Sequence, residues 1–291
     1  MLATFKNHFL TMKKLFFIIF FALLTSCSHK NEKQWVANKD QPKAEKLISN
    51  KKMILIEGGQ YTPFYGRKDT LVTVQPFWMD ETPITNAEFL EFVKKNPQWS
   101  KSKVKAIYAD STYLKDWPSD FELPKNYKPN SPVCYVSWFA AKAYAESVGK
   151  RLPTQDEWEF TGQADATSKD ATKKPSYSSD IIDLYNIKDK QYGEVGKSTP
   201  NVYGIYNMFD MIWEWSEDFN STLTTGDSRK SQFDDKQLSC AGSAISANDI
   251  YNYAAFMRFA FRTSVKANYS ISNLGFRCAK DANPKSDIKA Q

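Results

Sequence analysis

The twelve residues from Gly149 to Phe160, which read G-K-R-L-P-T-Q-D-E-W-E-F, constrain the fold more than any other stretch of the sequence. Gly149 suits the left-handed conformation that ends a helix, and Pro153 favours an extended lead-in. Thr154 and Glu157 have the spacing of a capping box, in which two side chains satisfy backbone N–H groups at a helix start. The segment therefore predicts the end of one helix and the start of another across a short, fixed connection.

Other local patterns predict short strands and helices. Residues 53–56 lead into a Gly-Gly turn, and residues 70–77 alternate as a half-buried strand does. Thr85 and Glu88 form a second capping box, which predicts a helix to Lys95. Ser137 can cap a further helix that runs to Val148. Short elements of both kinds, in this mixed order, indicate an α+β chain.

Two polar stretches predict loops. Residues 101–130 contain several prolines and tyrosines together with Trp117, which indicates a long surface excursion. Residues 165–179 hold almost no apolar side chain, which is typical of a mobile loop. The chain beyond them is rich in aromatic residues, and its pattern predicts few further helices.

The N-terminal region resembles a bacterial export signal. The first 26 residues hold three lysines and no acid, and the ten residues 15–24 are all apolar. Ten residues are too few to span a bilayer. The run ends in Leu24-Thr25-Ser26-Cys27, which resembles a lipobox, so Cys27 is expected to be the lipidated first residue of the mature protein and Met12 the true start. The alternative is an ordinary signal peptide with an incidental cysteine; both readings place the protein outside the cytoplasm.

Charge argues against a nucleic-acid partner. The formal net charge is +6, but removal of residues 1–26 leaves 36 basic residues against 33 acids, a net +3. No basic stripe interleaved with aromatics is present. Residues 27–52 are rich in lysine and poor in apolar residues, which predicts a flexible tether. The preferred interpretation of its lysines is a solvated spacer, and the alternative is a segment that favours anionic headgroups. Residues 53–281 are expected to form one domain and residues 282–291 a C-terminal tail.

The twelve-residue segment and four further motifs, in the same order, resemble the formylglycine-generating enzyme (sulfatase-modifying factor) family. The four motifs are Pro83 to Phe89, Pro132 to Trp138, Asn201 to Trp215 and Asn273 to Cys278. The resemblance spans about residues 53 to 281. It implies a variant of the C-type lectin fold, with few short helices and much irregular structure.

Family members that oxidise cysteine to formylglycine resemble one another in an R-G-G-S segment followed by two cysteines five positions apart, whose thiolates bind copper. The matching segment here runs from Cys240 to Ser246 and lacks the arginine. Counting onward from Ser243 places Ser246 and Tyr251 at the thiol positions. With an insertion in this region, the second position falls near Ala254 instead.

Metal-dependent oxidation is not expected of this chain. There is no cysteine between Ala241 and Arg277, and hydroxyl or methyl groups cannot hold Cu(I). A second enzymatic branch of the family holds iron with histidines, but the only histidines are His8 and His29, outside the domain. We therefore expect neither copper nor iron.

Three cysteines remain in the mature domain: Cys134, Cys240 and Cys278. Cys278 matches a family cysteine in a structural bridge, whose usual partner position is Ala145 here. A pairing of Cys278 with Cys134 or Cys240 stays open, as do buried roles for all three thiols.

The resemblance implies calcium as a structural cofactor. The family segment that matches Asn207 to Glu214 wraps one Ca²⁺ with an Asn, two backbone carbonyls and a Glu. These ligands correspond to Asn207, Asp210, Ile212 and Glu214, and such hard oxygen donors suit calcium. A second family site begins at a pair that matches Asn186-Ile187. The alternative is that this segment is an aromatic core turn.

The preferred interpretation is a lipid-anchored protein, facing the periplasm or cell surface of a bacterium, whose domain binds a protein or peptide without catalysis. One alternative is an enzyme with a rebuilt site in the same cleft. Its candidate residues are Ser243, Ser246, Tyr251 and Arg262, which lack a histidine base. The other alternative is a lectin-like module that stacks tryptophan or tyrosine on a glycan.

Overall fold

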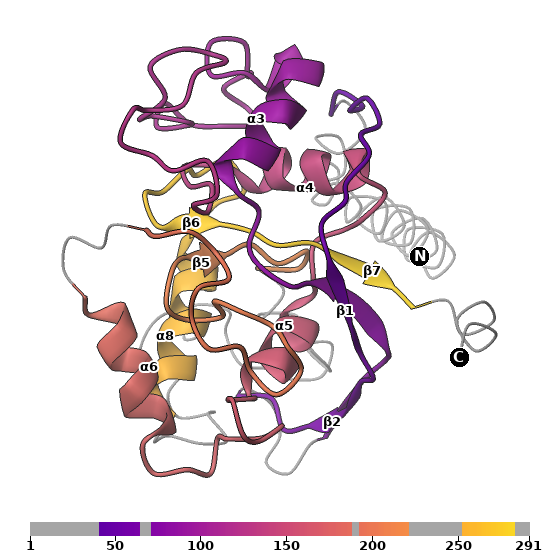
Figure 1. Cartoon of the computed structure of the whole chain (residues 1–291), viewed down its shortest axis with the longest axis vertical. Helices are drawn as coiled ribbons and strands as arrows, with labels where there is room; N and C mark the ends of the chain where they lie inside the picture. The colour runs from indigo at the N-terminus through magenta and orange to yellow at the C-terminus, as the bar shows by residue number, and fades with distance from the viewer. Residues whose placement is uncertain (1–40, 65–70, 188–191, 221–251, 283–291) are drawn as a thin grey trace, which may run out of the picture. The chain divides into compact units, whose positions relative to one another are not determined.

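The computed structural model describes residues 41–64, 71–187, 192–220 and 252–282. The chain divides into two units, Met1–Lys43 and Ala44–Gln291, and the elements within the described residues belong to the second. The elements in chain order are β1 (Met53–Ile56), β2 (Gly59–Tyr61), β3 (Val72–Val74), β4 (Phe77–Asp80), α3 (Asn86–Lys95), the 3₁₀ turn η1 (Pro97–Trp99), α4 (Trp138–Ser147), α5 (Gln155–Gly162), α6 (Tyr177–Tyr185), β5 (Trp213–Glu214), α8 (Tyr253–Ser264), β6 (Leu274–Gly275) and β7 (Ala279–Asp281). Short elements joined by long irregular segments make this an α+β fold, as predicted (Figure 1).

The predicted capping signals form as expected. Thr85 and Glu88 make a capping box at the start of α3, and Thr154 and Glu157 make one at the start of α5. Ser137 caps α4 by accepting a hydrogen bond from the Ala140 N–H. These helices begin where local chemistry satisfies their free backbone N–H groups.

The strand predicted over residues 70–77 is instead two strands. Antiparallel β2 and β3 pair with each other, whereas β4 lies between β1 and β7 in a separate sheet. Pro76 separates β3 from β4, and proline has no N–H to donate to a ladder. The strand before Pro76, β3, therefore pairs with β2, and the strand after it, β4, pairs with β1 and β7.

The described residues at the C-terminal end of the predicted tether contact the domain. The Leu47 N–H donates to the Ser147 carbonyl, which ends α4. The Lys51 side chain is only 7 % exposed, and its ammonium pairs with Glu88 at 2.9 Å. Residues 44–52 are thus attached to the domain, because the lysine charge that suggested a solvated spacer is neutralised by an acid of α3.

Residues 101–130 are not a surface excursion, because they contribute to the main core. Tyr108, Tyr113, Leu114 and Trp117 are all buried and pack with side chains of α3 and α4. Trp117 meets Phe89 of α3 edge-on at 6.5 Å between ring centroids. The segment is irregular, but Tyr108, Tyr113 and Trp117 face inward, whereas Phe121 remains exposed.

The C-terminal strands bring distant motifs together. Strands β5 and β6 pair in parallel, with Trp213 opposite Leu274 and Glu214 opposite Gly275. A Cβ on Gly275 would lie 2.2 Å from the Val133 carbonyl oxygen, so only glycine allows this close approach. Figure 1 shows α8 beside these strands and next to α6, with which it packs.

None of the described helices reaches the length and apolar character that crossing a membrane requires.

Candidate functional site

The expected calcium segment contains one close pair of potential ligands. Asn207 has a left-handed backbone (φ 56°) and donates its side-chain N–H to Asp210 at 3.0 Å and to Ser198 at 3.0 Å. Its side-chain oxygen accepts the Gly196 N–H at 2.7 Å. The structure therefore brings Asn207 and Asp210 together, as the resemblance implies.

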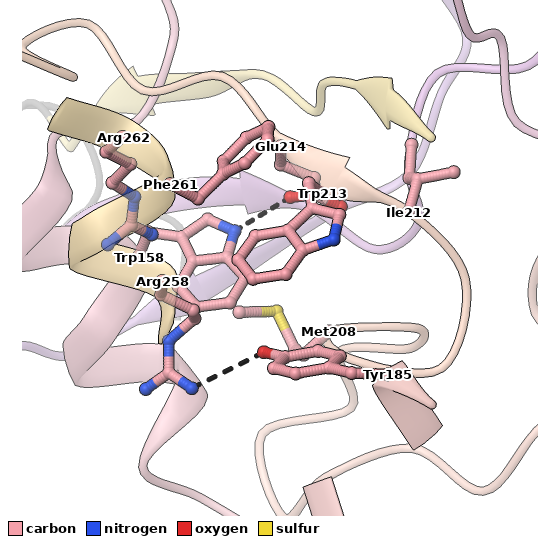
Figure 2. A pocket seen from close by; sticks show the side chains of 9 residues that line it. All are labelled: Trp158, Tyr185, Met208, Ile212, Trp213, Glu214, Arg258, Phe261 and Arg262. Atoms are coloured by element: carbon pink, nitrogen blue, oxygen red, sulfur yellow. Dashed lines mark hydrogen bonds between the residues drawn. The ribbon is translucent and has the colours of Figure 1, made fainter. Parts of the chain in front are cut away.

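Glu214 is engaged in a different interaction. Its side chain and that of Arg277 are both 0 % exposed, and Arg277 donates from Nε to Oε2 at 2.8 Å and from Nη2 to Oε1 at 2.9 Å. The Trp158 indole N–H donates to Oε2 at 2.8 Å (Figure 2). Arg277 also donates to the carbonyl oxygen of Asn207 at 3.1 Å. A guanidinium thus already supplies the positive charge that this carboxylate needs.

The two remaining expected calcium ligands lie in or next to β5. Both oxygens of Glu214 accept hydrogen bonds from Arg277, and one of them also accepts from Trp158. Ile212 is buried, and its expected ligand atom is its backbone carbonyl oxygen. Within the described ranges, no three His, Cys, Asp or Glu side chains are grouped as a metal site. Calcium in this segment stays a prediction, and its carboxylate would be that of Asp210.

If Asp210 holds calcium, the metal should raise thermal stability. A ligand that binds only the folded state at ~100 times Kd adds about 2.7 kcal/mol, which for a domain of this size raises Tm by roughly 5 to 10 °C. We expect EDTA and Asp210→Asn each to abolish the shift in differential scanning calorimetry. Asp183→Asn, at an exposed aspartate of α6, is the matched control. A melting curve of the wild type that ignores both calcium and EDTA would contradict the assignment.

The expected second calcium position lies at the end of α6. Asn186 is the C-terminal cap of this helix and donates its N–H to the Ile182 carbonyl. Both Asn186 and Ile187 are exposed. The structure describes nothing beside them that completes a ligand set.

Of the positions expected for the two copper-binding thiols, only Ala254 lies within the described residues. Cys240, Ser243, Ser246 and Tyr251 lie outside the described residues. Ala254 lies in the first turn of α8 and is 0 % exposed, packed with Ala171, Tyr177 and Ile181. With the insertion, a buried methyl group therefore stands where the family has a thiolate.

The two described domain cysteines do not form a bridge. Cys134 and Cys278 are both free and buried. Burial raises the pKa of each thiol, and the nearby Asp116 and Asp80 carboxylates raise them further. The Cys134–Cys278 pairing is therefore absent, while Cys240 lies outside the described residues. Both described thiols are buried small apolar groups of low reactivity.

Arg262, expected in the cleft, belongs to a buried charge cluster on α8. Arg258 and Arg262 are one helical turn apart and both face Glu159 of α5. Arg258 donates to Glu159 from Nε at 3.0 Å and from Nη2 at 2.7 Å, and Arg262 donates from Nη1 at 2.5 Å. Burial alone would raise the pKa of Glu159, but the two arginine charges lower it to about 2. The carboxylate is therefore ionised at neutral pH.

Aromatic rings surround this cluster. The Arg258 and Arg262 guanidinium carbons lie 5.6 and 5.0 Å from the Trp158 ring centroid. Trp213 stands between Tyr185 and Phe261, at 4.8 and 4.6 Å between centroids. Figure 2 shows these rings and both arginines around one pocket, with Arg258 reaching towards the Tyr185 hydroxyl at 3.5 Å. The pocket has a volume of about 10 Å³, which is room for one water molecule.

Sequence reasoning missed Glu159, Arg258 and the two helices that frame the pocket. Helix α6 begins inside residues 165–179, which were predicted to be a mobile loop. The available signal for α8 was the pair of arginines at i and i+4 in an aromatic run, which is a helical spacing. Glu159 stands in the twelve-residue segment, but its partners lie 99 and 103 positions further along the chain.

Comparison with known proteins identifies related sequences. The family model described as "Sulfatase-modifying factor enzyme 1-like domain" matches residues 38–282. The chain is 29% identical over 262 residues to the formylglycine-generating enzyme of Streptomyces coelicolor, covering 76% of this chain and 83% of that protein. It is 28% identical over 251 residues to the bovine (Bos taurus) protein named "Inactive C-alpha-formylglycine-generating enzyme 2", covering 72% and 79%.

Two further similarities are more limited. The chain is 28% identical over 190 residues to the serine/threonine-protein kinase pkn1 of Chlamydia pneumoniae, covering 63% of this chain but spanning only 30% of the kinase. The solved structure of PvdO from Pseudomonas aeruginosa aligns with a TM-score of 0.45 at 20% identity, covering 79% of this chain and 94% of that chain.

Proposed function

The chain belongs to the family of sulfatase-modifying factor enzyme 1-like domains, and from this premise we propose that it is an exported lipoprotein whose domain binds a peptide or protein partner and does not perform the family oxidation. Family membership alone does not decide the activity, because the similar proteins include both formylglycine-generating enzymes and ones named inactive. Whether this chain performs the oxidation therefore depends on the residues at its own site.

The observation that carries the proposal is the loss of the thiol ligands. The sequence has no cysteine between Ala241 and Arg277. Ala254, the second thiol position if the insertion is allowed, is a fully buried methyl group inside α8. Copper-dependent oxidation needs soft sulfur ligands that can reach both the metal and the substrate. A buried alanine offers neither, which favours a role in binding.

The pocket beside α8 is too small to enclose a whole small-molecule substrate. Its volume of about 10 Å³ is far below the roughly 300 Å³ or more of typical ligand pockets. A peptide partner can place one terminal group in it while the rest of the peptide stays outside, so the pocket is compatible with the proposed peptide binding.

We expect the purified full-length protein, loaded with Cu(I) under oxygen, to leave a cysteine-containing sulfatase peptide unchanged. The reason is the missing pair of thiolates. The measurement is the mass of the peptide after incubation, with the Streptomyces coelicolor formylglycine-generating enzyme as the active control. A product lighter by the replacement of the thiol with an aldehyde would overturn the proposal and direct attention to Cys240.

A further inference from the structure

We infer that the pocket between Arg258 and Arg262 is a subsite for a carboxylate group of the bound peptide, an inference that rests on the proposed peptide-binding function. The pocket is lined by side chains of α8, α5, α6 and β5, together with Met208 and Ile212 of the segment before β5. Its side chains combine an excess of positive charge with an aromatic wall.

The charge balance of the pocket is incomplete without a ligand. Two guanidinium groups, each belonging to a residue at most 5 % exposed, share the single carboxylate of Glu159. Glu214 also lines the pocket, but Arg277 already neutralises it. Asp156, the other acid nearby on α5, accepts a hydrogen bond from Tyr61, and no ion pair joins it to either arginine in the described part of the chain. One buried positive charge therefore remains, which is unfavourable unless an anion completes it.

Arg262 has donors available for that anion. Among the described residues, its hydrogen bonding is limited to the Nη1 contact with Glu159. A guanidinium carries five N–H donors in a planar fork, so Nε and Nη2 can still donate. Arg258 by contrast uses two nitrogens on Glu159 and extends Nη1 towards Tyr185. Arg258 thus holds Glu159 in place, and Arg262 is the arginine that can receive a ligand.

The proposed peptide partner determines the class of anion. The anionic groups of an unmodified peptide are its carboxylates, and a volume of about 10 Å³ admits one carboxylate oxygen, which a guanidinium N–H can bind. The half-buried rings of Tyr185, Trp213 and Phe261 can receive an apolar or aromatic side chain adjacent to that carboxylate. The carboxylate can come from a peptide C-terminus or from an aspartate or glutamate side chain.

The test uses the full-length protein in detergent and three short peptides, with binding followed by tryptophan fluorescence and calorimetry. The probes are N-acetyl-glycyl-phenylalanine, its C-terminal amide, and N-acetyl-aspartyl-phenylalanine amide. We expect a carboxylate to improve affinity about 10-fold over the neutral amide, as a charge-assisted hydrogen bond does. Preference for the first probe assigns a C-terminal carboxylate, and preference for the third assigns an acidic side chain.

Variants in and just beyond α8 distinguish the loss of the arginine charge from a loss of folding. Arg262→Gln should lower carboxylate affinity about 10-fold and leave amide affinity unchanged, whereas Lys266→Gln, at an exposed lysine just beyond α8, should change neither. Because Arg258 still pairs with Glu159, Arg262→Gln is expected to fold, and circular dichroism checks this. Arg262→Lys keeps the charge without the planar fork and should show an intermediate loss.

Equal binding of acid and amide, or unchanged affinity in folded Arg262→Gln, would overturn the subsite and leave the proposed peptide binding standing. No binding of any probe would overturn the subsite together with binding of these peptides. The oxidation assay is independent of all three results and tests the non-catalytic role separately.

Discussion

Replacing Arg277 with methionine is expected to lower the free energy of unfolding by about 3 to 5 kcal/mol, because it leaves the Glu214 carboxylate buried and unpaired. Both side chains are 0 % exposed, and Arg277 donates to both carboxylate oxygens. It also donates to the carbonyl oxygens of Tyr206 and Asn207, so the loop before β5 loses its anchor as well. For a domain of this size, the loss corresponds to a fall in Tm of roughly 10 °C or more.

Urea unfolding and calorimetry measure this effect. The matched control is Lys94→Met, which removes the cation of the exposed Lys94–Glu91 pair and should cost at most about 1 kcal/mol. A double variant, Arg277→Met with Glu214→Leu, should be more stable than Arg277→Met alone, since it removes both buried charges. If the single variant melts like the wild type, the pair does not hold the loop as described.

The parts of the fold that sequence predicted well are those fixed by residues close together in the chain. Thr85 with Glu88, and Thr154 with Glu157, are three positions apart, and each makes the capping box its spacing predicts. Gly149 has the expected left-handed backbone (φ 68°). In each case the decisive interaction is local, so no knowledge of the tertiary fold was needed.

The predictions that differ from the structure concern segments whose contacts are with residues far away in the sequence. Residues 101–130 looked like a polar excursion, yet Trp117 is buried against Phe89 of α3. The lysine-rich residues before β1 looked like a spacer, yet Lys51 pairs with Glu88, 37 positions away. Local composition does not reveal a contact with residues far along the chain, so it predicts solvent exposure for both segments.

In the candidate site, too, the sequence identified individual residues but not the partners that lie far from them along the chain. The resemblance selected Glu214 as a calcium ligand, but the structure pairs it with Arg277, which lies 63 positions later. Arg262 was expected in the cleft and is indeed beside the pocket, whereas its partner Glu159 was missed. Motif matching locates residues of the site in the sequence. Whether a buried side chain is charged, and which group it pairs with, depends on neighbours that are distant in the sequence.

Replacing Cys27 with alanine is expected to transfer the protein from the membrane fraction to the soluble fraction. Cys27 lies outside the described residues, and the expectation rests on Leu24-Thr25-Ser26-Cys27 after a short apolar run. Each buried CH₂ of an acyl chain adds about 0.8 kcal/mol of membrane affinity, and stable attachment requires more than one chain. Loss of the thiol removes the attachment point of these chains, so the partition should change by orders of magnitude.

Membrane flotation followed by immunoblotting measures the partition, and mass spectrometry of the N-terminal peptide measures the acyl groups. Cys240→Ala makes the same substitution at another cysteine and should leave the protein in the membrane fraction. Washing with high salt separates lipid anchoring from the lysine-rich segment that follows Cys27, because salt screens attraction to headgroups but does not extract acyl chains. Wild-type protein that is soluble in the periplasm, or a membrane-bound Cys27→Ala variant that resists salt, would show that Cys27 is not the anchor.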